Sequence, residues 1–344
     1  MENNKNYFFG FDYLRAGLCI FVVAWHNVIF GPPTVLNSSM IEHLSPTVAD
    51  IIYFNILLLA VPTFFLTSIF LYVLLRQHRP ANYFIDRIKR FASLLIFWSL
   101  TVSLYRYMMG WNLNDYFNGR LQTALTIVTG GRSVFYYFFS LIVLTGIAEA
   151  FFLFTRKIKR HKNFILWVSL AFSLIILIIA PRVLAQYKIA FDFWSPFNFI
   201  PYAFCAFIIA DYSTSKHYNT ITAVLFLLYL VFSVMDWMLI KYYIWDHYRG
   251  YIMPTYARIS IPFGAMFLVL LCSRIARPPA KIISHLAQYS LGIYCFHTFI
   301  SEDRLSKLFT FSSSQRLLNF LVQLGGSIIL TAVFKRVIWL RNFV

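Results

Sequence analysis

Apolar stretches long enough to cross a lipid bilayer recur along almost the whole chain, and this feature limits the possible folds more than any other. A helix needs about 20 mostly apolar residues to cross the hydrocarbon core of a membrane. Ten stretches of roughly that length lie at residues 11–30, 51–75, 91–109, 133–155, 164–181, 196–211, 220–241, 257–273, 284–301 and 317–340. The sequence therefore predicts an all-α, polytopic integral membrane protein with about ten transmembrane helices.

The composition agrees with a chain that lies mostly in lipid. Of the 344 residues, 60% are hydrophobic and only 12% are charged, whereas a soluble domain carries about 25% charged residues. No connection between the predicted spans is long enough to fold by itself. We therefore expect one membrane-embedded domain over residues 1–344.

The basic residues follow the pattern of a membrane topology signal. The net charge is +17, which in a soluble protein would suggest nucleic-acid binding. Here the connection after the first predicted span has no Lys or Arg, and the next one contains Arg76, Arg79, Arg87, Lys89 and Arg90. Basic residues accumulate on the cytoplasmic side of membrane proteins. We therefore expect both termini to face the cytoplasm and exclude nucleic acid as a partner.

The cysteines predict neither a disulfide framework nor a metal site. Each lies inside an apolar stretch, and their spacing matches neither pattern. We expect four reduced, structural thiols and no metal. The residues are Cys19, Cys205, Cys272 and Cys295.

Ionisable residues at membrane depth are functional candidates by default because burying them in lipid is costly. The first predicted span holds the densest group, Asp12, Arg15 and His26, and its charges indicate a retained helix and not a cleaved signal peptide. Arg15 and His26 are eleven residues apart, which is about three turns and roughly 16 Å along one helical face. The alternative is that Asp12 and Arg15 form a snorkelling pair and that His26 bonds a neighbouring helix.

A second group of candidates lies near the cytoplasmic ends of the next spans. Arg87 and Arg90 are three residues apart, so they share a helical face, where two guanidinium groups can bind a phosphate. Topology alone also explains this basic charge. Glu149 and Asp236 fall within spans, where each could serve a proton relay or pair with a neighbouring helix, and the sequence identifies no partner for either. Structural roles suffice for Ser68.

Tyr294 and His297 form another polar pair late in the chain. They are three residues apart and therefore lie on a common helical face. The alternative for the tyrosine is membership of the aromatic belt at the membrane interface.

Four of these segments, in this order, resemble the motifs of the family 3 membrane acyltransferases. Asp-Tyr-Leu-Arg at 12–15 with His26 resembles the family's opening signature. Pro-Thr-Phe-Phe-Leu-Thr-Ser at 62–68 resembles its second-helix motif, Arg-Ile-Lys-Arg at 87–90 its RxxR motif, and the segment 290–297 its late Ser-x-Gly-x-Tyr-x-x-His motif. Two positions depart from the pattern: Ile69 stands where a glycine is usual, and Tyr137 where relatives often have tryptophan.

The resemblance implies an enzyme of the bacterial cytoplasmic membrane. Such an enzyme takes an acyl group, commonly acetyl, from acyl-CoA at the cytoplasmic face and transfers it to a sugar hydroxyl of a cell-envelope glycan or lipid-linked glycan. The acyl donor, the glycan and membrane lipids would be its partners, and a separate polysaccharide-synthesis protein could assist it.

The resemblance also implies a role for each candidate residue. His26 would be the general base or would carry the acyl group itself, and Arg87 and Arg90 would hold the phosphates of CoA. Asp12 and Arg15 would line the inner entrance or fix the first helix. The remaining candidates would bind substrate or orient His26, and they are Ser68, Tyr137, Tyr294 and His297.

Two other classes fit the composition. A transporter or flippase for a glycan or lipid-linked glycan would also place polar residues in a membrane cavity, without making a bond. A membrane scaffold would tolerate the loss of His26 or Arg90 without a change in phenotype. The ordered motifs favour the enzyme.

Overall fold

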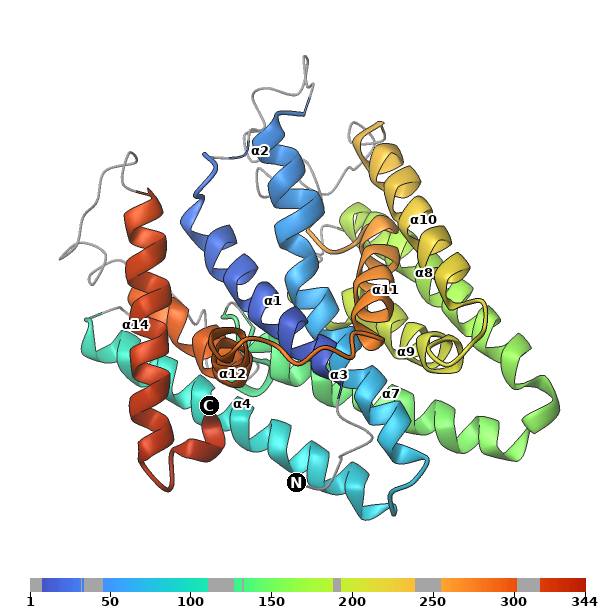
Figure 1. The fold of residues 1–344 in the computed structure, drawn as a ribbon, viewed down its shortest axis with the longest axis horizontal. Helices are drawn as coiled ribbons and strands as arrows, with labels where there is room; N and C mark the ends of the chain where they lie inside the picture. Colours follow the sequence, from blue (N-terminus) through green and yellow to red (C-terminus); the bar gives the residue numbers. More distant parts are fainter. Residues whose placement is uncertain are drawn as a thin grey trace.

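The described residues of the computed structural model are helical or lie in the turns between helices, with no strand among them (Figure 1). They are residues 8–31, 33, 46–110, 127–131, 133–187, 193–238, 255–301 and 316–344. The α-helices are α1 (Phe9–Asn27), α2 (Val48–Ile51), α3 (Ala60–Arg76), α4 (Asn82–Met108), α7 (Tyr136–Lys157), α8 (Lys162–Gln186), α9 (Ile200–Tyr212), α10 (Tyr218–Met238), α11 (Ser260–Ser273), α12 (Lys281–Ser301) and α14 (Arg316–Arg336). The all-α prediction is therefore confirmed for this part of the chain.

Short helices of other types complete the described structure. The π-helix η3 (Ile52–Ile56) and the 3₁₀ helix η4 (Leu57–Leu59) join α2 to α3. Three more 3₁₀ helices lie elsewhere, and they are η5 (Lys159–His161), η6 (Pro196–Phe199) and η10 (Arg341–Phe343).

Each of the ten predicted stretches coincides with a helix, but ten membrane crossings are not confirmed. Within the described residues, six helices are long and apolar enough to cross a membrane, which fits a multi-pass membrane protein. Helices α9 and α11 have 13 and 14 residues, and α1 and α12 carry polar residues that lower their hydropathy. The six are Val48–Arg76, Asn82–Met108, Tyr136–Lys157, Lys162–Pro181, Tyr218–Met238 and Arg316–Arg336.

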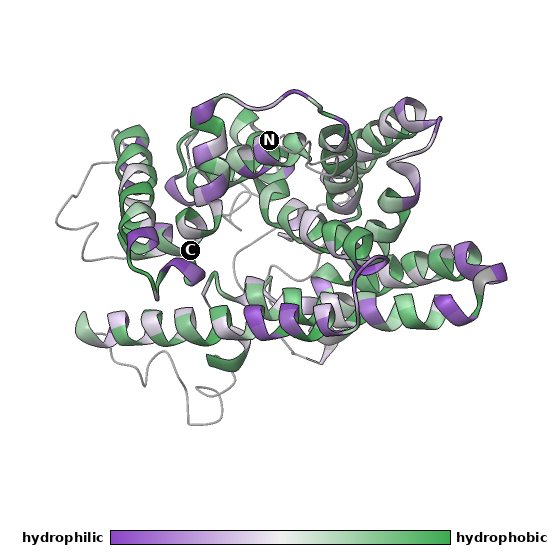
Figure 2. Ribbon diagram, turned by 60° about the horizontal axis from the view of Figure 1, so that its bottom comes forward, coloured by the Kyte–Doolittle hydropathy of each residue, from purple (hydrophilic) through white to green (hydrophobic). Residues whose placement is uncertain are grey.

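Helix α1 occupies the centre of the bundle. It packs against α3 and α11 on one side and against α12 and α14 on the other (Figure 1). Helices α8 and α10 lie at the periphery and expose large apolar side chains such as Phe172 and Leu227. Figure 2 shows the helices coloured mostly as hydrophobic, with hydrophilic residues gathered near turns and at one part of α4. Exposed apolar side chains on peripheral helices are expected where lipid replaces water as the solvent.

Helix α4 begins earlier than predicted. The apolar pattern placed its start at residue 91, whereas the helix begins at Asn82, after Pro80, a residue common near helix starts. The basic residues of its first turns lower the hydropathy without ending the helix. Arg87 and Arg90 are therefore held on a rigid helix and not on a connecting loop.

The helix break at η3 and η4 exposes carbonyl groups that other segments satisfy. Arg258 donates to the carbonyl oxygen of Phe54, and Tyr229 donates to that of Asn55. The Asn55 side chain accepts from Trp237 Nε1 at 2.9 Å. π-Helical turns inside a helix are frequent at functional sites, and this one directs the 57–61 segment toward α1.

The structure also identifies the partner of Asp236. Its carboxylate lies 3.7 Å from the guanidinium of Arg258 and accepts a hydrogen bond from Ser260. Of the two alternatives for Asp236, pairing between neighbouring segments accounts for its burial. The four cysteines are buried and unpaired.

Candidate active site

The His26 side chain lines a cavity at the C-terminal end of α1. The cavity has a volume of about 460 Å³, and the His26 side chain is exposed to it. Its walls come from α1, the broken segment at 57–61, α4, residues 133–136, residues 255–256 and α12. We call this space the histidine cavity.

A second cavity lies toward the start of α1. It has a volume of about 430 Å³ and is lined by Arg15, Arg87 and Arg90, together with Ser68 and Tyr137. Together with Tyr294, the structure thus brings six of the predicted site residues into one space. We call this space the arginine cavity.

Tyr294 of α12 lines both cavities. Its hydroxyl donates a hydrogen bond of 2.6 Å to the carbonyl oxygen of Val134, and its ring centroid lies 5.2 Å from that of Tyr137. The two cavities therefore adjoin each other, and the wall between them includes this one aromatic side chain.

Arg87 is held in a defined position at the edge of the arginine cavity. Its Nη2 donates to the side-chain and backbone oxygens of Ser68 at 2.7 and 2.9 Å, and its Nε donates to Thr145 Oγ1 at 3.4 Å. The guanidinium carbon lies 5.1 Å from the Tyr72 ring centroid and 4.8 Å from that of Phe91. Ser68, for which sequence reasoning needed only a structural role, thus contacts the predicted phosphate-binding group directly.

His297 lies behind His26 and lines neither cavity. The two imidazole ring centroids are 5.0 Å apart, and His297 is fully buried. Its Nδ1 lies 2.6 Å from the carbonyl oxygen of Tyr294. Because a carbonyl oxygen only accepts hydrogen bonds, Nδ1 carries the proton and Nε2 is an acceptor. Among the described residues, Nε2 has no hydrogen-bond partner.

A polar chain from α14 fixes this histidine pair from behind. Gln323 Nε2 donates to the backbone carbonyl of His297, and the Gln323 side-chain oxygen accepts from Asn27, the neighbour of His26. Helices α1, α12 and α14 are thereby connected at the level of the two histidines.

The eleven-residue spacing on α1 separates Arg15 from His26. Arg15 lines the arginine cavity and His26 the histidine cavity, so the two face different spaces. Asp12 is buried on α1 and lines neither cavity. Asp12 therefore lies within the helix packing around α1.

Sequence reasoning did not single out several residues that line the histidine cavity. Arg106 lies near the end of α4, and the aromatic side chains Trp25, Tyr136 and Tyr256 form much of the wall. The charge at residue 106 at the end of an apolar stretch was a usable signal. The aromatic residues gave none, because lipid-facing helices contain many such side chains.

Comparisons with known proteins identify the family. No curated protein and no solved structure matches the chain. The sequence profile of the acyltransferase 3 family, described as an acyltransferase domain, matches residues 8–336, nearly the whole length. That range includes the helices that line both cavities. The chain therefore belongs to the acyltransferase 3 family.

Proposed function

We propose that this membrane acyltransferase transfers an acyl group, acetyl in the first instance, from cytoplasmic acyl-CoA to a hydroxyl of a cell-envelope glycan. The observation that carries the proposal is the pair of cavities that adjoin at Tyr294, one with His26 and the other with three arginines. The first offers a base for an acceptor, and the second offers positive charge for a donor that contains phosphate.

The arginine cavity fits the donor. Guanidinium groups bind phosphate oxygens through charge-assisted, often bidentate hydrogen bonds. Arg87 and Arg90 lie one helical turn apart on α4, and Arg15 adds a third charge from α1. The pantetheine arm of CoA is long and narrow, and it would extend from these arginines past Tyr294 toward His26.

The histidine cavity fits a sugar acceptor. Binding pockets for small molecules combine apolar and aromatic walls with a few polar groups that fix orientation. The rings of Trp25, Tyr136 and Tyr256 offer flat surfaces for the apolar face of a pyranose, and Ser133 and Thr298 offer hydroxyl groups. The exposed His26 then reaches a hydroxyl of the bound sugar.

In the simplest chemistry the acyl group moves in one transfer. The acceptor hydroxyl attacks the thioester carbonyl, His26 removes the hydroxyl proton, and the C–S bond breaks. The imidazolium then returns the proton to the departing thiolate of CoA, which leaves the ester and free CoA. An acyl-His26 intermediate is the two-step alternative.

The topology predicted from the basic residues supports access from opposite sides. The arginine cavity is lined by the first halves of α1 and α4, residues 287–294 of α12, residues 64–71 of α3 and residues 137–141 of α7. Except for the start of α7, these segments lie toward chain ends or connections that are predicted to be cytoplasmic. The histidine cavity is lined by the opposite ends of α1 and α4, so it would open toward the outer face of the cell membrane.

Mass spectrometry of envelope glycans and lipid-linked intermediates tests this function. Cells that make the wild-type protein, the His26→Ala variant or neither are compared at matched membrane levels of the two proteins. We expect alkali-labile acyl groups only with the wild type. Equal acylation in all three would refute the proposal, and accumulation of unmodified glycan without any loss of acylation would indicate transport instead.

A further inference from the structure

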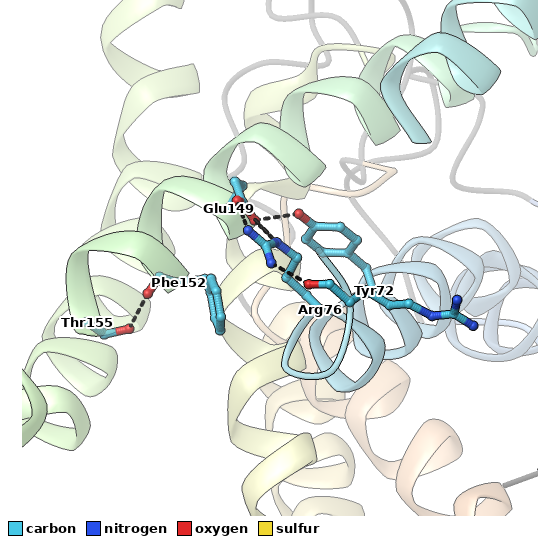
Figure 3. Close-up of polar contacts among 6 residues, drawn as sticks. Tyr72, Arg76, Glu149, Phe152 and Thr155 are labelled. Carbon is cyan, nitrogen blue, oxygen red and sulfur yellow. Dashed lines mark hydrogen bonds and ion pairs between the residues drawn. The ribbon is translucent and has the colours of Figure 1, made fainter. Parts of the chain in front are cut away.

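A buried polar cluster joins α3 to α7 (Figure 3). The carboxylate of Glu149 accepts hydrogen bonds from the Tyr72 hydroxyl at 2.6 Å and from Arg76 Nε at 2.9 Å and Nη2 at 2.8 Å. All three side chains are buried. The cluster lines neither the arginine cavity nor the histidine cavity.

The hydrogen bonds tie Glu149 to α3. Both carboxylate oxygens are occupied, and Arg76 balances the charge at a separation of 2.8 Å. Of the two alternatives that the sequence left open for this residue, pairing with a neighbouring helix accounts for its burial. Buried ion pairs contribute little net stability compared with apolar packing, so the use of this one lies in the geometry that it fixes.

The cluster fixes two features next to Arg87. Arg76 Nη1 donates to the carbonyl oxygen of Arg79 at 2.9 Å, which holds the turn from α3 into α4. The bond from the Tyr72 hydroxyl to Glu149 fixes the orientation of the Tyr72 ring, and the Arg87 guanidinium lies over that ring.

The position of Arg87 therefore depends on contacts from α3, α4 and α7. Ser68 holds its Nη2, Thr145 of α7 accepts from its Nε, and the rings of Tyr72 and Phe91 lie against its guanidinium. Thr145 and Glu149 are four residues apart on one face of α7, so a single helix holds both Arg87 and the tyrosine that supports it.

We propose that Tyr72 and Glu149 are positioning residues that hold Arg87 ready for the phosphate groups of the acyl donor. The inference rests on the proposed function, in which Arg87 binds those phosphates. A guanidinium that is already oriented loses less conformational freedom when the ligand binds. Loss of the Tyr72 hydroxyl therefore weakens donor binding without touching the donor or the acyl-transfer chemistry.

The test measures binding of coenzyme A to the full chain in lipid nanodiscs by calorimetric titration. Tyr72→Phe removes only the bond to Glu149, and we expect binding about fivefold weaker, as for the loss of one hydrogen bond. Tyr72→Leu also removes one of the two rings that lie against Arg87 and leaves the Phe91 ring in place, and we expect coenzyme A to bind about twentyfold more weakly than to the wild type. In an Arg87→Ala background neither substitution should weaken binding further, because the group that they position is absent.

Tyr218→Phe is the matched control. Tyr218 is also a buried tyrosine, and its hydroxyl donates a 2.6 Å bond to the carbonyl oxygen of Leu270, away from both cavities. This variant should bind coenzyme A as the wild type does. In acyl-transfer assays the Tyr72 variants should raise KM for acetyl-CoA and leave kcat unchanged, which a general loss of structure would not do.

The possible outcomes distinguish a failure of the positioning role of Tyr72 from a failure of the proposed donor site. If Arg87→Ala weakens binding but Tyr72→Phe and Tyr72→Leu bind like the wild type, the positioning role is wrong and the donor site stands. If the wild type does not bind coenzyme A, or Arg87→Ala has no effect, both the donor site and the inference fail. Tyr72→Phe keeps the buried ring, so it decides the question even where the leucine variant does not fold.

Discussion

Substitution of Tyr294 tests whether this side chain keeps the two cavities functionally separate. In the proposed reaction, the acyl thioester passes Tyr294 to reach the histidine cavity. Water from the histidine cavity must not reach the thioester before the acceptor does, because it would hydrolyse the thioester. Among the described residues, Tyr294 is the one side chain that lines both cavities, and Tyr294→Ala removes it. We expect this variant to hydrolyse acetyl-CoA without an acceptor and to accept longer acyl chains than the wild type.

The structure sets the size of each perturbation. Tyr294→Phe keeps the ring and loses only the 2.6 Å hydrogen bond to Val134, a loss of about 1 kcal/mol in the free energy of unfolding. Tyr294→Ala removes a side chain that is 5% exposed, and such truncations cost about 3 to 5 kcal/mol. We expect the lower end of that range, because the ring already borders two open spaces.

Phe296→Ala provides the control for destabilisation. Phe296 lies on the same helix, is also 5% exposed, and packs against Trp98 and Phe334 without lining either cavity. The assay measures free CoA release with and without acceptor, over a series of acyl chain lengths, in proteins of matched membrane level. If Tyr294→Ala and Phe296→Ala give the same ratio of hydrolysis to transfer and the same chain-length profile, Tyr294 does not separate the two cavities functionally.

Two further predictions concern the buried polar contacts. Arg76→Met leaves the Glu149 carboxylate buried without its counter-charge, so the free energy of unfolding should fall by about 3 to 5 kcal/mol. Thermal unfolding in detergent measures this change, and an unfolding midpoint equal to that of the wild type would contradict the ion-pair argument. His297→Asn removes the imidazole beside His26 and leaves the arginine cavity intact, so kcat should fall while KM for acetyl-CoA stays unchanged. A change confined to KM would place His297 in donor binding instead.

Apolarity predicted the location of the helices better than the number of crossings. Helices α8 and α10 were found within a few residues because lipid-facing residues dominate both. The crossing count depends on helices such as α1 and α12, whose hydropathy is lowered by polar residues including His26 and His297. The polar residues that mark these two helices as candidate parts of the site therefore also lower the hydropathy from which a membrane crossing is predicted.

The candidate site shows a similar division between local and long-range information. Spacing along one helix correctly placed Arg87 beside Arg90, because that relation is local. The partner of Glu149 is 73 residues away in sequence, and Arg76 carried no signal beyond its contribution to topology. Likewise, nothing local distinguishes Tyr294 as a shared wall from a tyrosine of the interfacial belt.

The contacts of α12 connect the wall between the cavities to the orientation of the proposed base. His297 Nδ1 donates to the backbone carbonyl of Tyr294, and its ring lies against His26. A shift of α12 that carries Tyr294 out of the wall therefore also moves His297 relative to His26, and Gln323 of α14 resists that shift through its bond to the His297 carbonyl. In the proposed reaction, the step that brings the thioester to the acceptor and the step that aligns the base would then depend on the same helix, so substitutions at Gln323 should alter both together.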